Sequence, residues 1–559
     1  MDMKRHIFAA LAAAVLLASP ISGQNLNPTV DVTRDYEVKM MEIRKPLQTM
    51  HIPDSVLKFN IDVDYSVFDN PYRGSYDFSP YLINVRPDAR KADDGRFYLR
   101  FGAGYPLHPE GDIVFSPRMK GPFRLGIYGH HRSYIGKYHD IVYDAGKYAK
   151  SGEWWKGRDM ATKAGVDGLY AWTGGLFSFD ASFNNLMMKD NSADRAFNAG
   201  ELKLRARSEN PGTGRFIYDV GVSGRYGASS GSSDIKEAGF LLDGSAGRKL
   251  SAHNGFSAAV HADASKYGGV IDDMGGVVAV TPKYYLSAGI FSLDAGVKLS
   301  YPFYSAGDYP AADRVSGQYI YPDIRISLTA PGGKFSFYVK ATGGDKFNSY
   351  SDVLRSNHHL YPLYGGFLGH DIERINAAAG IRAGDASRFQ LDISGGWSSV
   401  KNGLFEGLYT HIFDNGGRVT IPIYGYSGYS TVFADMFYAV KSRKVDFNGH
   451  LSFRHTTMDA NASPVLFKPA MLSGDMLLSY DTGNRVKTGL SCEFASERKT
   501  LGDSAVPGYA DLAVFAEAAV NGHFSVWIKG SNLLGMTIQR VPGFAEKGIW
   551  GTAGICLKF

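Results

Sequence analysis

Apolar and polar residues alternate along much of this chain. In the segment 444–454, KVDFNGHLSFR, every second residue is apolar or glycine: Val445, Phe447, Gly449, Leu451 and Phe453. A helical period does not fit this order, whereas a strand places alternate side chains on opposite faces. The same alternation occurs in the segments 201–207, 291–300, 323–328, 334–341, 388–394 and 485–494. These segments predict strands with one apolar face and one charged face.

The spacing of the turns indicates how these strands are joined. Short turns near 173–175, 331–333, 385–386, 442–443, 482–484 and 521–522 are interleaved with long connections near 132–158, 303–317, 345–371, 400–428 and 534–548. Outer-membrane barrels have this asymmetry, with short periplasmic turns and long outer loops. A soluble β-sandwich has no reason to alternate short connections with long ones. Aromatic clusters near strand ends, at 152–157, 301–309 and 361–367, suit interfacial girdles.

The predicted fold is therefore all-β: a large transmembrane antiparallel β-barrel with a short N-terminal periplasmic segment. Strands laid between the turns begin at 97–105, end at 549–559 and number about 22, an even count. An extra hairpin inside 400–428 would raise that number.

The last strand explains why the chain finishes on an aromatic residue. In a closed barrel the final strand pairs with the first, so that neither has a free edge. We expect one set of alternate side chains to face lipid and the other to face the lumen. The lipid-facing set is Ala553, Ile555, Leu557 and Phe559, and the lumenal set is Gly554, Cys556 and Lys558.

The first residues predict export. Lys4 and Arg5 precede the apolar run IFAALAAAVLLAS, and small residues follow up to Gly23, which is typical of a secretory signal peptide over 1–23. Residues 24–96 form a proline-containing periplasmic or lumenal segment, too short for a large core or a full plug. Residues 97–559 form the barrel. No later apolar run reaches the ~18 residues of a membrane helix.

Composition and charge narrow the function classes. The 66 Gly, 34 Tyr and 34 Phe, together with a mean hydropathy of −0.18, suit a membrane barrel, whose alternating segments average out as polar. The net charge of +5 comes from 60 basic and 55 acidic residues spread along the chain, which argues against a nucleic-acid partner. Cys492 and Cys556 lie in alternating runs and are interpreted as packing residues, with a bridge between them as the alternative.

Charged side chains collect on the face predicted to line the lumen. We interpret this set as a solvated wall in which mixed charges pair across strands, and the alternative is a selectivity lining for a charged solute. The mixed signs argue against a simple preference for anions or cations. The set is Lys444, Asp446, His450, Arg454, Arg485, Lys487, Glu493, Glu517 and Lys529.

No metal, cofactor or catalytic site is predicted. His130 and His131 are adjacent, so on a strand they point to opposite faces and cannot chelate one ion without a bulge. His358 and His359 raise the same question. No motif places a nucleophile beside a base, so an enzyme is not expected.

The final strands resemble a known family. FSVWIKGSNLLG followed by a loop and GIWGTAGICLKF is similar to the last two strands of TonB-dependent receptors, and FYLRFGAGYPLHPEGDIVFSPRM resembles the start of their barrel. The leader VDVTRDYEVKMMEIRKP resembles that of a plug-deficient subset found in Bacteroidetes. In TVDVTRDY, the residues Thr29, Val30, Val32 and Thr33 resemble a TonB-contacting box.

The resemblance implies a location in the cell outer membrane and two classes of function. The first is solute uptake or transport across that membrane, with outer-membrane lipid, an unidentified solute and the TonB system as partners. The second is a non-transporting scaffold or interaction subunit that holds other envelope proteins. Passive diffusion, a third possibility, requires an open lumen.

Overall fold

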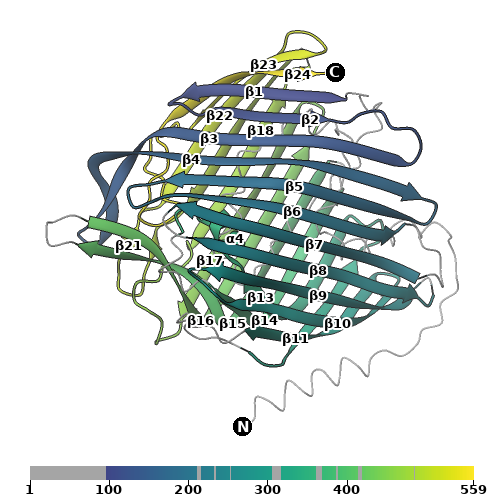
Figure 1. Ribbon diagram of the computed structural model, residues 1–559. Coiled ribbons are helices and arrows are strands. Elements are labelled where there is room, and N and C mark those ends of the chain that lie inside the picture. The colour runs from purple at the N-terminus through teal and green to yellow at the C-terminus, as the bar shows by residue number, and fades with distance from the viewer. Residues whose placement is uncertain are drawn as a thin grey trace. The chain divides into compact units, whose positions relative to one another are not determined.

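The computed structural model describes residues 96–559 apart from 210–215, 232–233, 252, 305–315, 361–367, 386–387, 413–417 and 484. The predicted signal peptide and the segment 24–95 lie outside the described residues. Most of the described chain consists of long antiparallel strands (Figure 1). Among these residues, no helix is long and apolar enough to cross a membrane.

The elements follow one another along the chain with a single helix inside one connection. The first strands are β1 (Phe97–Tyr105), β2 (Glu110–Phe115), β3 (Phe123–Asp144), β4 (Lys147–Trp172), β5 (Gly175–Lys189), β6 (Asp194–Ser208), β7 (Phe216–Gly231), β8 (Ile235–Lys249), β9 (Asn254–Gly269), β10 (Met274–Ala288), β11 (Phe291–Tyr304), β12 (Tyr319–Thr329) and β13 (Phe335–Asn348). There follow α4 (Tyr350–Ser356), β14 (Gly369–Asp385), β15 (Phe389–Ile412), β16 (Arg418–Lys441), β17 (Val445–Met458), β18 (Leu472–Asp481), β19 (Val486–Ala495), β20 (Arg498–Lys499), β21 (Ala505–Val506), β22 (Tyr509–Ala519), β23 (Phe524–Ser531) and β24 (Trp550–Lys558).

The sheet closes on itself through its first and last strands. Apart from β20 and β21, each strand pairs in antiparallel register with the strand that follows it, β19 with β22, and β24 pairs with β1 from Tyr98↔Lys558 to Tyr105↔Gly551. The short strands β20 and β21 lie in the connection between β19 and β22, so the barrel has 22 strands. The predicted fold class and strand number are confirmed, as are all seven alternating segments as strands.

Closure extends to the last residue. The amide of Phe97 donates to the carbonyl of Phe559 at 2.9 Å, and the amide of Phe559 donates back to Phe97 at 2.9 Å. Ile555 and Phe559 are exposed on the outer face, while Cys556 is fully buried. Both cysteines are free thiols, so the bridge between Cys492 and Cys556 does not form.

The two ends of the barrel differ as the turn spacing predicts, with two corrections. The predicted long connections at 132–158 and 400–428 are mostly strand, because β3–β4 and β15–β16 continue as paired hairpins well beyond the others. A strand needs only ~9–11 residues to cross the hydrocarbon, so the rest of these strands projects past it on the loop side. The described residues of 400–428 contain no hairpin other than β15–β16. The connection at 345–371 contains α4, and that at 534–548 is a loop; 303–317 is mostly outside the described residues.

The outer wall presents apolar side chains and the inner wall polar ones. Exposed apolar residues alternate along the strands, as at Ile324, Ile326 and Leu328 of β12 and at Val339 of β13. Between them, Ser327 and Arg325 face inward, and the Arg325 guanidinium lies 5.2 Å from the Tyr338 ring. An apolar outside that no other element covers is the arrangement expected for a wall in contact with acyl chains.

This arrangement predicts the effect of a charge on the outer face. Val339 is 43% exposed and lies in the membrane-crossing part of β13. We expect Val339→Arg to destabilise the barrel by about 2–4 kcal/mol, because the charge would have to enter hydrocarbon. Unfolding by denaturant in lipid vesicles measures this, with Val339→Leu as the control. Equal stability of the two variants would show that this face does not contact lipid.

Candidate functional site

The charged residues of the inner wall are largely paired across neighbouring strands. The Arg454 guanidinium contacts the Asp435 carboxylate at 2.7 Å, and Nε2 of His450 lies 3.5 Å from the same group. Nζ of Lys558 lies 3.7 Å from Glu517. Cross-strand pairs of this kind are how a sheet stabilises a charged face.

The structure places the predicted lumen-lining residues in two kinds of position. Lys444 and Arg485 lie in the turns that precede β17 and β19. The others lie in strands: Asp446, His450 and Arg454 in β17, Lys487 and Glu493 in β19, Glu517 in β22 and Lys529 in β23. Of these, His450 and Arg454 share Asp435, and Lys487 lies opposite Glu517 in register.

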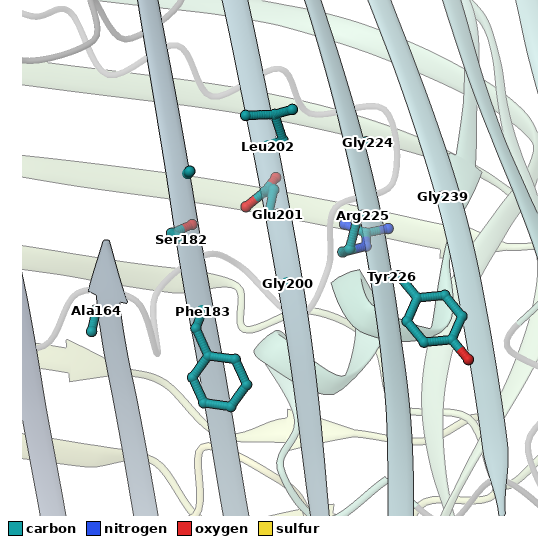
Figure 2. Close-up of a pocket in the computed structure, with 11 residues that line it drawn as sticks. Ala164, Ser182, Phe183, Gly200, Glu201, Leu202, Gly224, Arg225, Tyr226 and Gly239 are labelled. Atoms are coloured by element: carbon teal, nitrogen blue, oxygen red, sulfur yellow. The ribbon is translucent and has the colours of Figure 1, made fainter. Parts of the chain in front are cut away.

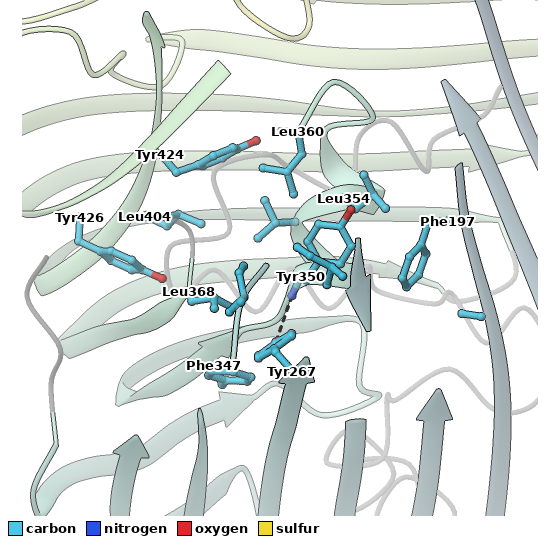
Figure 3. Packing of buried hydrophobic residues seen from close by; sticks show 14 of the residues in the cluster. Phe197, Tyr267, Phe347, Tyr350, Leu354, Leu360, Leu368, Leu404, Tyr424 and Tyr426 are labelled. Atoms are coloured by element: carbon cyan, nitrogen blue, oxygen red, sulfur yellow. Dashed lines mark hydrogen bonds between the residues drawn. The ribbon is translucent and has the colours of Figure 1, made fainter. Parts of the chain in front are cut away.

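The connection after β13 crosses the barrel near the end where the long loops lie. Apolar residues of this connection are buried in one cluster with Phe197 of β6, Tyr267 of β9 and Tyr424 of β16 (Figure 3). Because β6 to β10 and β15 to β16 belong to separate arcs of the wall, a short segment that packs on both arcs spans the mouth. The residues it contributes are Tyr350, Val353, Leu354, Leu360 and Leu368.

The start of α4 is held by a buried ion pair. Both backbone and side chain of Ser351 donate to the Glu237 carboxylate, at 2.9 and 3.0 Å. Arg225 of β7 donates to Glu237 at 2.6 Å and to the hydroxyl of Ser349 at 3.2 Å. Glu237 is fully buried, so a carboxylate placed there needs all of these donors. These contacts fix α4 to the wall.

The end of the segment is held by a second buried carboxylate. Asp190, in the turn between β5 and β6, pairs with Arg195 and lies 3.0 Å from Nδ1 of His359. Burial lowers the pKa of His359. Burial opposes ionisation of Asp190, but the hydrogen bond from His359 and the charge of Arg195 outweigh it and lower the pKa of Asp190. A neutral imidazole with its proton on Nδ1 therefore donates to an ionised carboxylate.

A third buried carboxylate, Glu406, holds the middle of the segment from the opposite arc. The amide of Asn357 and the hydroxyl of Tyr424 donate to one oxygen of Glu406, at 3.3 and 3.1 Å. The other oxygen has no hydrogen-bond donor among the described residues, and Arg498 lies 4.0 Å from it. Glu406 lies in the part of β15 that projects beyond the membrane. Burial raises its pKa to about 7.

A second segment, from the loop between β23 and β24, meets the first. The Phe544 ring stacks on His359 with centroids 4.0 Å apart. Arg540 contacts Glu493 at 2.9 Å, Asp511 at 3.2 Å and also Glu546. Burial opposes the charge of Arg540, but Glu546 and Glu493 outweigh it and keep its pKa well above the usual value. We call residues 349–360 and 538–546 together the mouth cap.

Of the residues that hold the mouth cap in place, only Glu493 is among those predicted from the sequence. Arg225, Glu237 and Glu406 look like any other inward charge of an alternating strand. Ser349 and Asp352, however, form an S-x-x-D pattern, in which the Ser349 hydroxyl accepts from the Asp352 amide at 3.3 Å and caps α4. That pattern could have predicted a helix inside the connection.

A depression of about 640 Å³ lies across β4 to β8 (Figure 2). Its lining includes Phe183, Leu202 and Tyr226, which are exposed on the outer wall, together with Gly200 and Gly224. It therefore opens toward lipid. Among the residues that the structure describes, no group of three or more His, Cys, Asp or Glu side chains is arranged to hold a metal ion.

The buried Glu406 predicts a pH dependence of the cap. Its pKa is raised from 4.5 to about 7 in the folded state, so the folded state binds more protons than the open state between these values. Stability of the closed cap therefore falls as pH rises from about 4.5 to about 7, by on the order of 2–3 kcal/mol. Hydrogen-exchange protection of residues 350–357, corrected for intrinsic rates, should decline over this range.

In Glu406→Gln, which stays neutral, that decline should disappear. The exposed Glu153→Gln is the matched control and should behave as the unsubstituted protein. An identical pH profile in Glu406→Gln and the unsubstituted chain would contradict the assignment.

No family model matches the chain, and no curated protein does. Solved structures do match. The FrpB iron transporter from Neisseria meningitidis (F3-3 variant) superposes with a TM-score of 0.62 at 10% identity, over 84% of this chain and 82% of that one. The siderophore receptor PirA from Acinetobacter baumannii gives 0.58 at 9%, over 83% and 80%. The copper transporter OprC gives 0.59 at 12%, over 83% and 80%. The chain thus shares its fold with transporters and receptors of this kind, in agreement with the resemblance of its final strands.

Proposed function

We propose that this chain is an outer-membrane barrel that takes up a solute through its lumen, and that the mouth cap closes the lumen at rest. The observation that carries the proposal is the cap itself: two segments of the same chain meet at the mouth of a wide barrel whose inner wall is charged. The fold shared with iron and copper transporters supports uptake over passive diffusion.

The cap is built so that a bound solute can compete with it. The ends of segment 349–360 are held at Glu237 and Asp190 and its middle at Glu406, and a charged or hydrogen-bonding solute could replace each of these contacts. The proposal includes the nine predicted inner-wall residues as the path of that solute. It also includes coupling to TonB through Thr29, Val30, Val32 and Thr33, in a plug-deficient chain. The solute is a charged or polar molecule that needs selection rather than sieving.

A scaffold role is the second candidate, and the projecting β3–β4 hairpin favours it. Trp154 and Tyr143 on this hairpin are 52% and 50% exposed. Exposed aromatic side chains beyond the membrane are typical of protein contact sites. Under this alternative the cap is permanent, and envelope proteins bind the hairpin.

Replacing residues 350–360 by a Gly-Ser linker of equal length tests the cap. The unsubstituted protein should show little conductance in planar bilayers. The linker variant should show a large steady conductance, because the part of the mouth cap that spans the barrel is gone. Trp154→Ala leaves the cap intact and should stay silent. A folded linker variant that stays silent would contradict closure by the cap.

Uptake is tested in the producing cells. Deletion of the gene should abolish growth on one nutrient class. Expression of the Trp154→Ala variant in the deletion strain should restore that growth. If growth is unaffected while native membranes yield specific partners that Trp154→Ala and Tyr143→Ala lose, the chain is a scaffold.

A further inference from the structure

Four basic side chains gather on the outer wall where β3, β4 and β5 approach the loop end. Lys137 lies directly opposite Lys156, and Arg158 lies directly opposite Lys189. Arg158 pairs with Asp194 at 2.8 Å. Lys137, Lys156 and Lys189 are exposed and have no ion-pair partner among the described residues. We call these four residues the basic cluster.

The cluster is unfavourable without an anion. Directly opposed residues of an antiparallel pair have Cβ atoms only ~4.5–5.5 Å apart, and like charges at that distance repel. Among the residues paired with these four cations in the register, the only carboxylate is Asp194, which lies opposite Lys189. An anion that binds between the strands would remove the repulsion.

The depression described above shares β4 and β5 with the basic cluster and extends over β6 to β8, closer to the middle of the membrane. In one register row, Gly200 is flanked by Phe183 of β5 and Tyr226 of β7, and in the next row Leu202 is flanked by Ala181 and Gly224. A Cβ added at Gly200 or Gly224 would meet nothing within 4 Å, so the space between the aromatic side chains is open. The exposed side chains of the depression are apolar and it opens to the hydrocarbon, as an acyl chain requires, while Ser182, Glu201 and Arg225 complete its lining.

The separation of the two features fits one lipid molecule. Lys189 lies six residues beyond Phe183 on β5, which on a tilted strand is a rise of about 15 Å. Asn185 lies on β5 between Phe183 and Lys189, and its side chain donates to Asn198 at 2.7 Å on the outer wall. We expect this polar pair to lie at the boundary between the hydrocarbon and the headgroups. An acyl chain in the depression and a headgroup at the basic cluster can therefore be parts of one lipid molecule.

We infer that this face binds a phosphorylated lipid of the outer leaflet, with its phosphate on Lys137, Lys156 and Lys189 and an acyl chain over Gly200 and Gly224. Phosphate supplies the anion that opposed lysines need, and the depression supplies selectivity for a lipid over a free anion. The site lies on the outer wall and does not depend on transport.

Native mass spectrometry of the full-length protein in detergent, titrated with diphosphorylated lipid A, tests the inference. The unsubstituted protein should retain one such lipid more strongly than phosphatidylcholine. The double variant Lys156→Glu, Lys189→Glu should weaken retention about tenfold or more, since each basic residue near a lipid surface contributes appreciably. Lys401→Glu, at an exposed lysine of another arc, is the matched control and should bind as the unsubstituted protein.

Gly200→Leu separates a lipid from a free anion. It should fill the depression, leave the barrel folded and weaken the lipid several-fold. Inorganic phosphate, added alone, should not displace the lipid at millimolar concentration. The inference is overturned if the double variant retains the lipid unchanged. It is also overturned if phosphate binds the cluster equally well and Gly200→Leu has no effect.

Discussion

The structure depends on one constraint: inside hydrocarbon, every backbone N–H and C=O must find a partner within the protein. An open sheet cannot satisfy its edges there, so β24 must pair with β1 along its whole length. This is why β24 pairs with β1 over Gly551 to Lys558 and why Phe97 and Phe559 exchange backbone hydrogen bonds. The alternating residue pattern follows from the same closure, because one face then meets lipid and the other meets the lumen.

A barrel of 22 strands encloses a wide lumen, which membrane barrels of this size usually fill with a plug. We propose that the mouth cap closes the lumen here. Three buried carboxylates, Asp190, Glu237 and Glu406, each hold the segment 349–360 from a different part of the wall. Burying such groups costs free energy unless donors surround them, so the contacts specify one position of the segment. Because these contacts are polar, a polar ligand could take the place of the segment's donors.

The strands could be predicted because their residue pattern is a direct consequence of the two environments they separate. Residues 444–454 alternate since apolar side chains such as Phe453 face lipid, and Ile555 alternates with Cys556 for the same reason. Beyond the membrane that cause is absent, and residues 402–408 of β15, for example, are all buried whatever face they lie on. The projecting parts of β3–β4 and β15–β16 therefore looked like loops.

The mouth cap could not be predicted for a different reason. Glu237 meets Ser351, and Asp190 meets His359, across large separations in sequence. No local pattern records such pairs. Only the Ser349–Asp352 capping pattern marked the helix locally. Of the candidate site, the charged wall was accessible to sequence reasoning and its closure was not.

The most direct test of the account is the accessibility of the lumen from outside the cell. Ser223 of β7 lies on the inward face two residues from Arg225, which contacts the cap. In a background that lacks Cys492 and Cys556, a large membrane-impermeant maleimide added to intact cells should label Lys147→Cys on the projecting hairpin and leave Ser223→Cys unlabelled. Labelling of Ser223→Cys as fast as Lys147→Cys would show an open mouth and contradict the account.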